Sequence, residues 1–94
     1  MEIKTSRIDE VEALSNKLEA ERGDALLATK ATITADRDRP GYYLIIVEFD
    51  SYDEAMKNSN DPETGKFAEQ MGALLDEPPK FFNLDVLLVM DRSR

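Results

Sequence analysis

The sequence has no cysteine, no histidine and no tryptophan. Without cysteine, disulfide bonds, zinc–thiolate sites and thiol nucleophiles are excluded. Without histidine, a Ser-His-Asp triad, an imidazole-ligated haem, a two-histidine-one-carboxylate iron site and the commonest general base are excluded as well. Any catalysis by this chain would therefore depend on carboxylates, tyrosine, lysine, arginine or amide groups.

Long apolar runs and an excess of positive charge are also missing. No apolar run approaches the ~20 residues of a membrane-spanning helix, and "MEIKTSRIDE" does not have the pattern of a signal peptide, so a cytoplasmic protein is expected. The formal net charge of -8 argues against nucleic acid and against an anionic membrane surface as partners, and it favours solubility. The 94 residues are predicted to form a single domain, residues 1–94.

The N-terminal part has the pattern of an amphipathic helix. Apolar residues recur at spacings of three and four, with Glu and Lys between them: Ile8, Val11, Leu14 and Leu18. Ser6, with Asp9 three residues later, is a candidate N-cap, and Gly23 is a candidate stop. The pattern predicts a helix over residues 8–22, and the few residues before it leave room for only a short first strand.

An antiparallel hairpin is predicted next, from "ALLATKATITAD" and "YYLIIVEF" joined by the turn "RDRPG". Residues that face each other across the hairpin must lie on the same side of the sheet. The register that places Asp36 opposite Tyr42 pairs small with large residues on one face. It also sets Lys30 opposite Glu48, and this pairing of opposite charges supports the register.

The remaining elements are an interrupted helical region and a final strand. Ser51 and Glu54 have capping-box spacing, and Asp61 followed by Pro62 is typical of a second helix start after the interruption. The segment "KFFNLDVLLVM" is predicted as a strand with one unbroken apolar face: Phe82, Leu84, Val86, Leu88 and Met90.

The predicted order is βαββαβ, an α+β fold with a four-stranded antiparallel sheet, a short first strand and the helices on one face. We assign the helix-covered face this apolar set: Ile33, Ile45, Val47, Phe49, Leu84, Val86 and Leu88. The far face of the sheet carries a second apolar set: Tyr42, Leu44, Ile46, Leu26, Phe81 and Leu87. Because an exposed apolar sheet face is costly, a homodimer through this face is predicted, and a monomer that hides the face under its own ends is the alternative.

Several stretches together resemble one known superfamily. They are the hairpin "RPGYYLIIVEF", the helix start "SYDEAMKNS", the restart "DPET" and the final "PPKFFNLDVL". Over residues 36–87 the chain resembles the dimeric α/β-barrel superfamily, most closely the small proteins grouped with the antibiotic-biosynthesis monooxygenases. The resemblance implies a ferredoxin-like protomer whose sheet pairs with a second sheet into an eight-stranded barrel. It departs from the haem-degrading branch, which uses an Asn, a Trp and a His, and from quinone-forming oxygenases that rely on Trp.

The resemblance also implies a ligand cavity between the sheet and the helices, where an apolar lining would carry a few polar anchors. The candidate substrate-binding residues are Tyr43, Asn58, Asn60, Phe67, Met71 and Asn83. Each has a structural alternative: the amides at 58 and 60 suit a helix cap and turn, the aromatic and Met side chains suit a core, and Asn83 with Asp85 suits an interface that fixes the register of a dimer. No metal site and no cofactor are predicted.

These observations lead to two functional hypotheses. The first is a homodimer that binds a small aromatic or polyketide-like molecule and, if it is an enzyme, acts as a cofactor-independent oxygenase. In such enzymes the carbanion of the substrate itself reduces oxygen, so no metal ligand is needed. The alternative is a non-catalytic ligand-binding or assembly module, which the absence of His and Trp favours.

Overall fold

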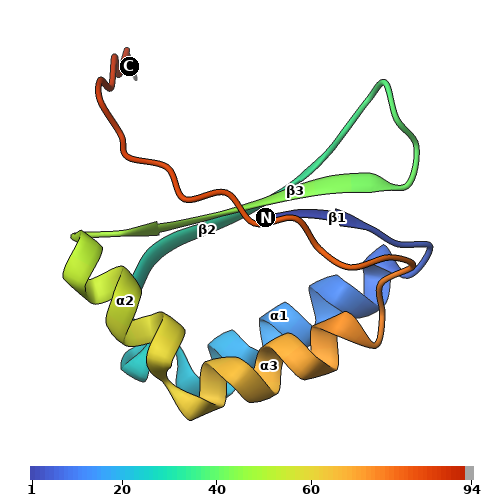
Figure 1. The fold of residues 1–94 in the computed structure, drawn as a ribbon, viewed down its shortest axis with the longest axis horizontal. Helices are drawn as coiled ribbons and strands as arrows, with labels where there is room; N and C mark the ends of the chain where they lie inside the picture. Colours follow the sequence, from blue (N-terminus) through green and yellow to red (C-terminus); the bar gives the residue numbers. More distant parts are fainter. Residues whose placement is uncertain (93–94) are drawn as a thin grey trace.

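A three-stranded antiparallel sheet lies over a layer of helices in the computed structural model, which describes residues 1–92 (Figure 1). The strands β1 (Glu2–Lys4), β2 (Ala28–Ala35) and β3 (Tyr42–Phe49) have the order β1-β3-β2. The helices are α1 (Ile8–Arg22), α2 (Tyr52–Asn60) and α3 (Pro62–Gly72), and the 3-10 turn η1 (Gly23–Ala25) leads from α1 to β2. The predicted α+β class, the antiparallel sheet and the placement of the helices on one face are confirmed.

The hairpin has the predicted register. Lys30 faces Glu48 and Ile33 faces Ile45, and the N–H of Asp36 donates to the carbonyl of Tyr42 over 3.0 Å. A tight turn closes the loop, in which the N–H of Tyr42 donates to the carbonyl of Arg39 over 3.1 Å. Gly41 has a φ of 89° in this turn, a conformation that glycine adopts without steric cost, and the preceding proline suits the position before it. The Pro-Gly pair therefore fixes the loop length and, with it, the register.

Two of the predicted helix starts form and one does not. The Ser51 hydroxyl accepts the N–H of Glu54 over 3.2 Å, and the Asp61 carboxylate accepts the N–H of Glu63 over 2.9 Å with Pro62 in the first turn. Helix α1 has the predicted bounds, but its N-cap position is Arg7 instead of Ser6, and no side chain caps it. The correction has a local cause, because the hydroxyl that accepts the Arg7 N–H, over 2.9 Å, belongs to Thr5.

The fourth strand does not form within the described residues. Residues 76–80 run beside β1, where Glu2 and Lys80 exchange backbone hydrogen bonds of 2.8 and 2.9 Å, and the N–H of Asp76 donates to the carbonyl of Lys4. Beyond Lys80 the chain leaves the sheet as an extended segment (Figure 1, orange to red). The physical reason is that β1 is only three residues long, so antiparallel pairing with it ends where β1 ends.

The core gathers at one end of the molecule, around β1. Its buried apolar side chains are Ile3, Val11, Ile45 and Met71. Thr5 is buried with them, and its hydroxyl donates to the carbonyl of Leu74 over 2.6 Å, which ties the start of the chain to the segment just after α3. The predicted core members Leu84, Val86 and Leu88 are instead strongly exposed, because they belong to the segment that leaves the sheet.

Replacing Gly41 or Gly65 with alanine should change the stability in opposite directions. Replacing Gly41 with alanine should lower the free energy of unfolding by about 1–2 kcal/mol, because the residue has a positive φ. The matched change Gly65→Ala should raise it by roughly 0.5–1 kcal/mol, because Gly65 lies inside α3 and an added Cβ meets no atom within 4 Å. Urea unfolding of both variants measures the two changes, and equal effects would contradict the turn assignment.

Candidate functional site

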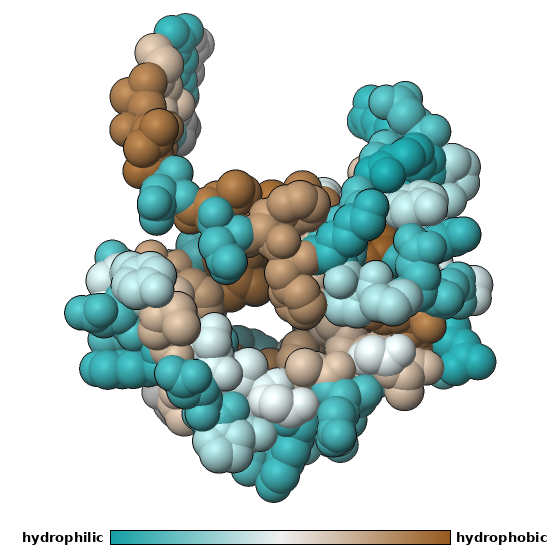
Figure 2. Space-filling model, viewed as in Figure 1, coloured by the Kyte–Doolittle hydropathy of each residue, from teal (hydrophilic) through white to brown (hydrophobic). Residues whose placement is uncertain are grey.

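A cavity of about 630 Å³ lies between the sheet and the helices. Figure 2 shows it as a hollow at the middle of the view, with apolar side chains along its upper border. Side chains from β2, β3, α1 and α3 form its walls, and the central apolar contributors are Leu18, Ala31, Ile33, Val47, Phe67 and Leu75. The hollow exists because the core lies near β1, while α1 and α3 stand away from the outer part of β2 and β3 (Figure 1).

Two amide side chains supply neutral polar groups in the cavity wall. Asn58 is in the last turn of α2 and Asn16 is in α1. Within residues 1–92, neither amide group has a hydrogen-bond partner, so each can donate to and accept from a ligand. Their separation along the chain means that the two anchors would contact a ligand from different helices.

The charged groups of the wall balance one another. Glu19, Arg22, Lys30 and Glu63 line the cavity, two acidic and two basic. Arg22 forms an ion pair with Asp61 over 3.4 Å, and Glu63 forms one with Lys66 over 3.2 Å. Glu19 and Lys30 have no ion-pair partner in the described part of the chain, so they are the wall groups best placed to exchange a proton with a ligand. A balanced wall with a mostly apolar lining suits a neutral ligand better than an ion.

The Arg22–Asp61 pair joins the end of α1 to the junction between α2 and α3. The hydrogen bond from the Glu63 N–H lowers the pKa of Asp61 below its usual 3.8, and the neighbouring Arg22 guanidinium adds to this effect. One carboxylate therefore caps α3 and also holds the C-terminal end of α1 beside it. Arg22 and Asn58 both line the cavity, so this contact holds one part of the wall in place.

The six predicted site residues occupy four different places. Asn58, Phe67 and Met71 line the cavity together. Tyr43 packs against the buried core cluster near β1, outside the cavity wall. Asn60 is the exposed last residue of α2, and Asn83 is in the exposed segment that leaves the sheet. The structure thus brings half of the predicted set to one site.

Sequence reasoning missed the contribution of α1 to the cavity. Ser15, Leu18, Glu19 and Arg22 form one stripe of this helix and all line the wall. Their spacing of three and four was visible in the sequence, but the stripe mixes polar and apolar residues and so did not stand out as a binding face. Leu26 and Phe81, which were predicted for the far face of the sheet, line the cavity on the helix side as well.

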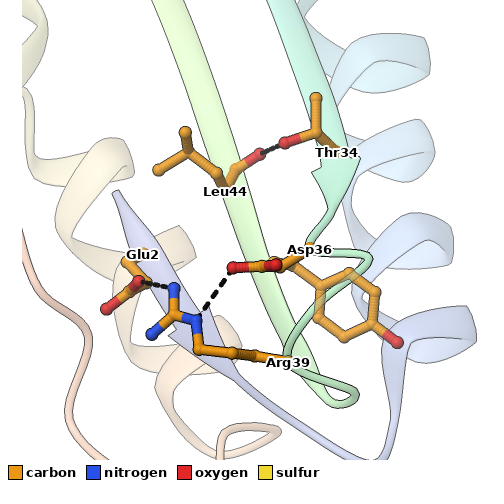
Figure 3. A pocket seen from close by; sticks show the side chains of 6 residues that line it. Glu2, Thr34, Asp36, Arg39 and Leu44 are labelled. Atoms are coloured by element: carbon orange, nitrogen blue, oxygen red, sulfur yellow. Dashed lines mark hydrogen bonds and ion pairs between the residues drawn. The ribbon is translucent and has the colours of Figure 1, made fainter.

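A second, smaller pocket of about 200 Å³ lies at the hairpin end of the sheet (Figure 3). Arg39 bridges the carboxylates of Glu2 and Asp36 there, and its guanidinium also lies 4.5 Å from the ring centre of Tyr42. The hydrogen bond from Arg39 is the main cause that lowers the pKa of Asp36, and the two carboxylates raise the pKa of Arg39. Because these charged groups pair with one another, they hold the hairpin loop against β1. They leave little hydrogen-bonding capacity for a ligand.

No group of three or more Asp or Glu side chains that could hold a metal ion is found in residues 1–92, and no helix described there is long and apolar enough to cross a membrane. Comparison of the chain with known protein families finds no match, and comparison with curated proteins finds none either. The resemblance to the dimeric α/β-barrel superfamily therefore stays a prediction.

The contribution of Asp61 to the free energy of unfolding should depend on pH. Because the pKa of Asp61 is lowered in the folded protein, its contribution to stability is present above its usual 3.8 and is lost as the pH falls through the lower, folded value. Asp61→Asn keeps a good capping residue but removes the charge, so this variant should lose less stability on acidification than the parent. Urea unfolding between about pH 7 and pH 2 measures the difference.

Asp53→Asn is the matched control. It removes a carboxylate from the first turn of α2, where Asp53 neither caps the helix nor forms an ion pair. This control should follow the parent curve. An Asp61→Asn curve that also follows the parent would contradict the assigned role of Asp61.

Proposed function

We propose that this chain is a homodimeric α/β-barrel protein that binds a small, neutral aromatic or polyketide-like molecule between its sheet and its helices. The observation that carries the proposal is the cavity of about 630 Å³, which falls within the ~300–1,000 Å³ usual for small-molecule sites. Its lining fits this ligand class, because Phe67 and Met71 offer apolar contacts and the free amides of Asn16 and Asn58 offer neutral hydrogen bonds.

The sheet supports the barrel part of the proposal. The order β1-β3-β2, with residues 76–80 antiparallel beside β1, is the order of a βαββαβ sheet up to the point where its fourth strand would continue. The far face of the sheet exposes Leu44 and Ile46 at 39% and 43%. A second copy packed on this face would cover both side chains and would close two sheets into a barrel.

Two versions of the function differ in what happens to the bound molecule. In an oxygenase, a wall base would remove a proton from the substrate, and the resulting carbanion would reduce dioxygen. Glu19 is the carboxylate we assign to this step, because it lines the cavity without an ion-pair partner in the described part of the chain. In a binding module the same cavity holds the ligand unchanged, and the absence of histidine favours this version.

Filling the cavity tests ligand binding. Ala31→Phe places a large ring in the wall, whereas Ala35→Phe makes the same change on the same strand outside the wall. With a panel of anthrones and hydroquinones, ligands that raise the melting temperature of the parent should bind Ala31→Phe about tenfold or more weakly, and Ala35→Phe normally. Equal binding by all three proteins, or no binding to the parent, would contradict the cavity as the site.

Oxygen consumption with the same panel separates the two versions. Turnover that Glu19→Gln abolishes, while thermal shifts persist, would support the oxygenase. Thermal shifts without oxygen consumption by the parent would support the binding module.

The dimer is tested on the far face. Ile46→Glu introduces a charge among apolar side chains of the proposed interface and should weaken dimerisation at least about tenfold. Met56→Glu is the matched control, because Met56 is exposed to a similar extent, 39%, on α2. Light scattering at several concentrations measures the dimer. A parent that stays monomeric at micromolar concentration, or an Ile46→Glu variant that dimerises like the control, would contradict the sheet-face dimer.

A further inference from the structure

The segment that leaves the sheet, residues 81–90, carries the largest exposed apolar surface of the described chain. Eight large apolar side chains more than half exposed lie on it: Phe81, Phe82, Leu84, Val86, Leu87, Leu88, Val89 and Met90. Leu87 is 94% exposed and Leu84 is 83% exposed. Figure 2 shows part of this surface as a brown projection that stands away from the body. A soluble monomer rarely exposes a contiguous apolar patch of more than a few hundred Å².

The chain direction makes pairing with the segment's own sheet unfavourable. Residues 76–80 run antiparallel to β1, and β1 runs antiparallel to β3, so the segment leaves the sheet parallel to β3. Strand β1 begins at Glu2, which already pairs with Lys80, and the next strand in the sheet is β3, one strand spacing further in. The segment would have to step inward by about 4.8 Å and form a parallel ladder, which is slightly less stable per residue than an antiparallel one.

An acceptor edge exists on β3. The N–H of Ile45 donates to the carbonyl of Met1 over 2.8 Å, whereas the carbonyl of Tyr42 accepts from the N–H of Asp36, just after β2. Backbone groups alternate between the two edges of a strand, so Val47 and Phe49 point their N–H and C=O groups to the same edge as Ile45. In residues 1–92 no strand lies beside them on that edge, because the pairing with β1 ends at Met1. Val47 is also 46% exposed in the cavity wall.

We propose that two copies of this chain exchange residues 81–90, each segment binding as an added strand at the Val47–Phe49 edge of the partner. This inference deepens the proposed dimer and rests on it. The segment of a second molecule can approach β3 in either chain direction. It can therefore form the antiparallel pairing that its own β3 does not offer. Unpaired edges of this kind are where added strands bind in other protein complexes.

The amounts of surface and chain fit a second copy. Ten extended residues span roughly 33 Å, about the largest extent of the chain as a whole, 34 Å, so the segment is long enough to reach across a partner. Eight large side chains at roughly 100 Å² each come to the about 800 Å² per partner of a standard stable interface. In a two-fold symmetric dimer, both segments are bound and both β3 edges are paired. Binding of an unrelated protein to the segment would leave the β3 edge of this chain unpaired.

Cysteine cross-linking between two different chains tests the exchange. Because the sequence has no cysteine, a Val47→Cys chain and a chain with one cysteine at Leu84, Val86 or Leu88 can form a mixed disulfide only between molecules. The two chains are unfolded together, refolded as a mixture and oxidised. At least one of the three segment positions should give a mixed covalent dimer in large excess over the control pair, in which Asn60→Cys on α2 replaces Val47→Cys. Phe49→Cys is the second acceptor variant if Val47→Cys does not fold.

The outcomes separate this inference from the sheet-face dimer. Mixed dimers no more abundant than in the control, in a protein that light scattering shows to be dimeric, would overturn the exchange and leave the sheet-face dimer standing. A monomeric parent would overturn both. A chain that carries Val47→Cys and Val86→Cys together and forms the disulfide only within one molecule would show that the segment folds back on its own β3, which also overturns the exchange.

Discussion

Strand β1 contains only three residues, and this length limits how much sheet and core can form around it. Three residues of β1 pair with β3 on one side and receive residues 76–80 on the other, so the strand joins the two halves of the chain. Ile3 at its centre is 1% exposed, and Thr5 just after it binds the backbone just before α1 and just after α3. Buried polar groups are tolerated where they are satisfied in this way. The buried core is therefore confined to the part of the sheet that pairs with β1.

Beyond the part of the sheet that β1 pairs with, the packing is incomplete. Two features of the structure follow from this, the cavity and the unpaired edge of β3. On the helix side, the walls of the outer sheet and of α1 and α3 do not meet, which leaves the cavity of about 630 Å³. At the sheet edge, β3 continues for several residues past the last residue that β1 can pair. A longer first strand would supply more core to fill the first gap and would close the second. Cavity and free edge are thus two consequences of one short strand.

Local patterns predicted most of the fold, and they failed where a distant partner decides the outcome. The hairpin register followed from side-chain alternation and the Pro40–Gly41 turn, and the α3 start followed from Asp61 before Pro62, all within a few residues. Residues 81–90 have the composition of a strand, but a strand also needs a neighbour, and composition contains no information about where β1 ends. The predicted cap of α1 was wrong as well, because the N-cap position is Arg7 and no side chain caps this helix, while the Thr5 hydroxyl accepts the Arg7 N–H.

The site was half predictable for a comparable reason. Phe67 and Met71 share the apolar stripe of α3, so any fold that covers the sheet with α3 brings them to one place. Asn58 joins them because α2 ends there, while Asn60 lies two residues further on and points elsewhere. Tyr43 and Asn83 were chosen for their chemistry, but their positions depend on how the chain packs around β1 and beyond Lys80. Residue type predicts which groups can bind, and only the tertiary packing decides which of them meet.

Phe81 links the cavity to the segment of the proposed exchange. This residue lines the cavity together with Pro79, and it is also the first residue of the segment that leaves the sheet. Because the backbone on its N-terminal side is held by the Glu2–Lys80 pair, the direction of the segment determines where the Phe81 ring lies relative to the cavity. Whatever fixes residues 82–90 therefore also fixes one wall of the cavity. In an exchanged dimer, each molecule would set the shape of its own cavity by binding the other.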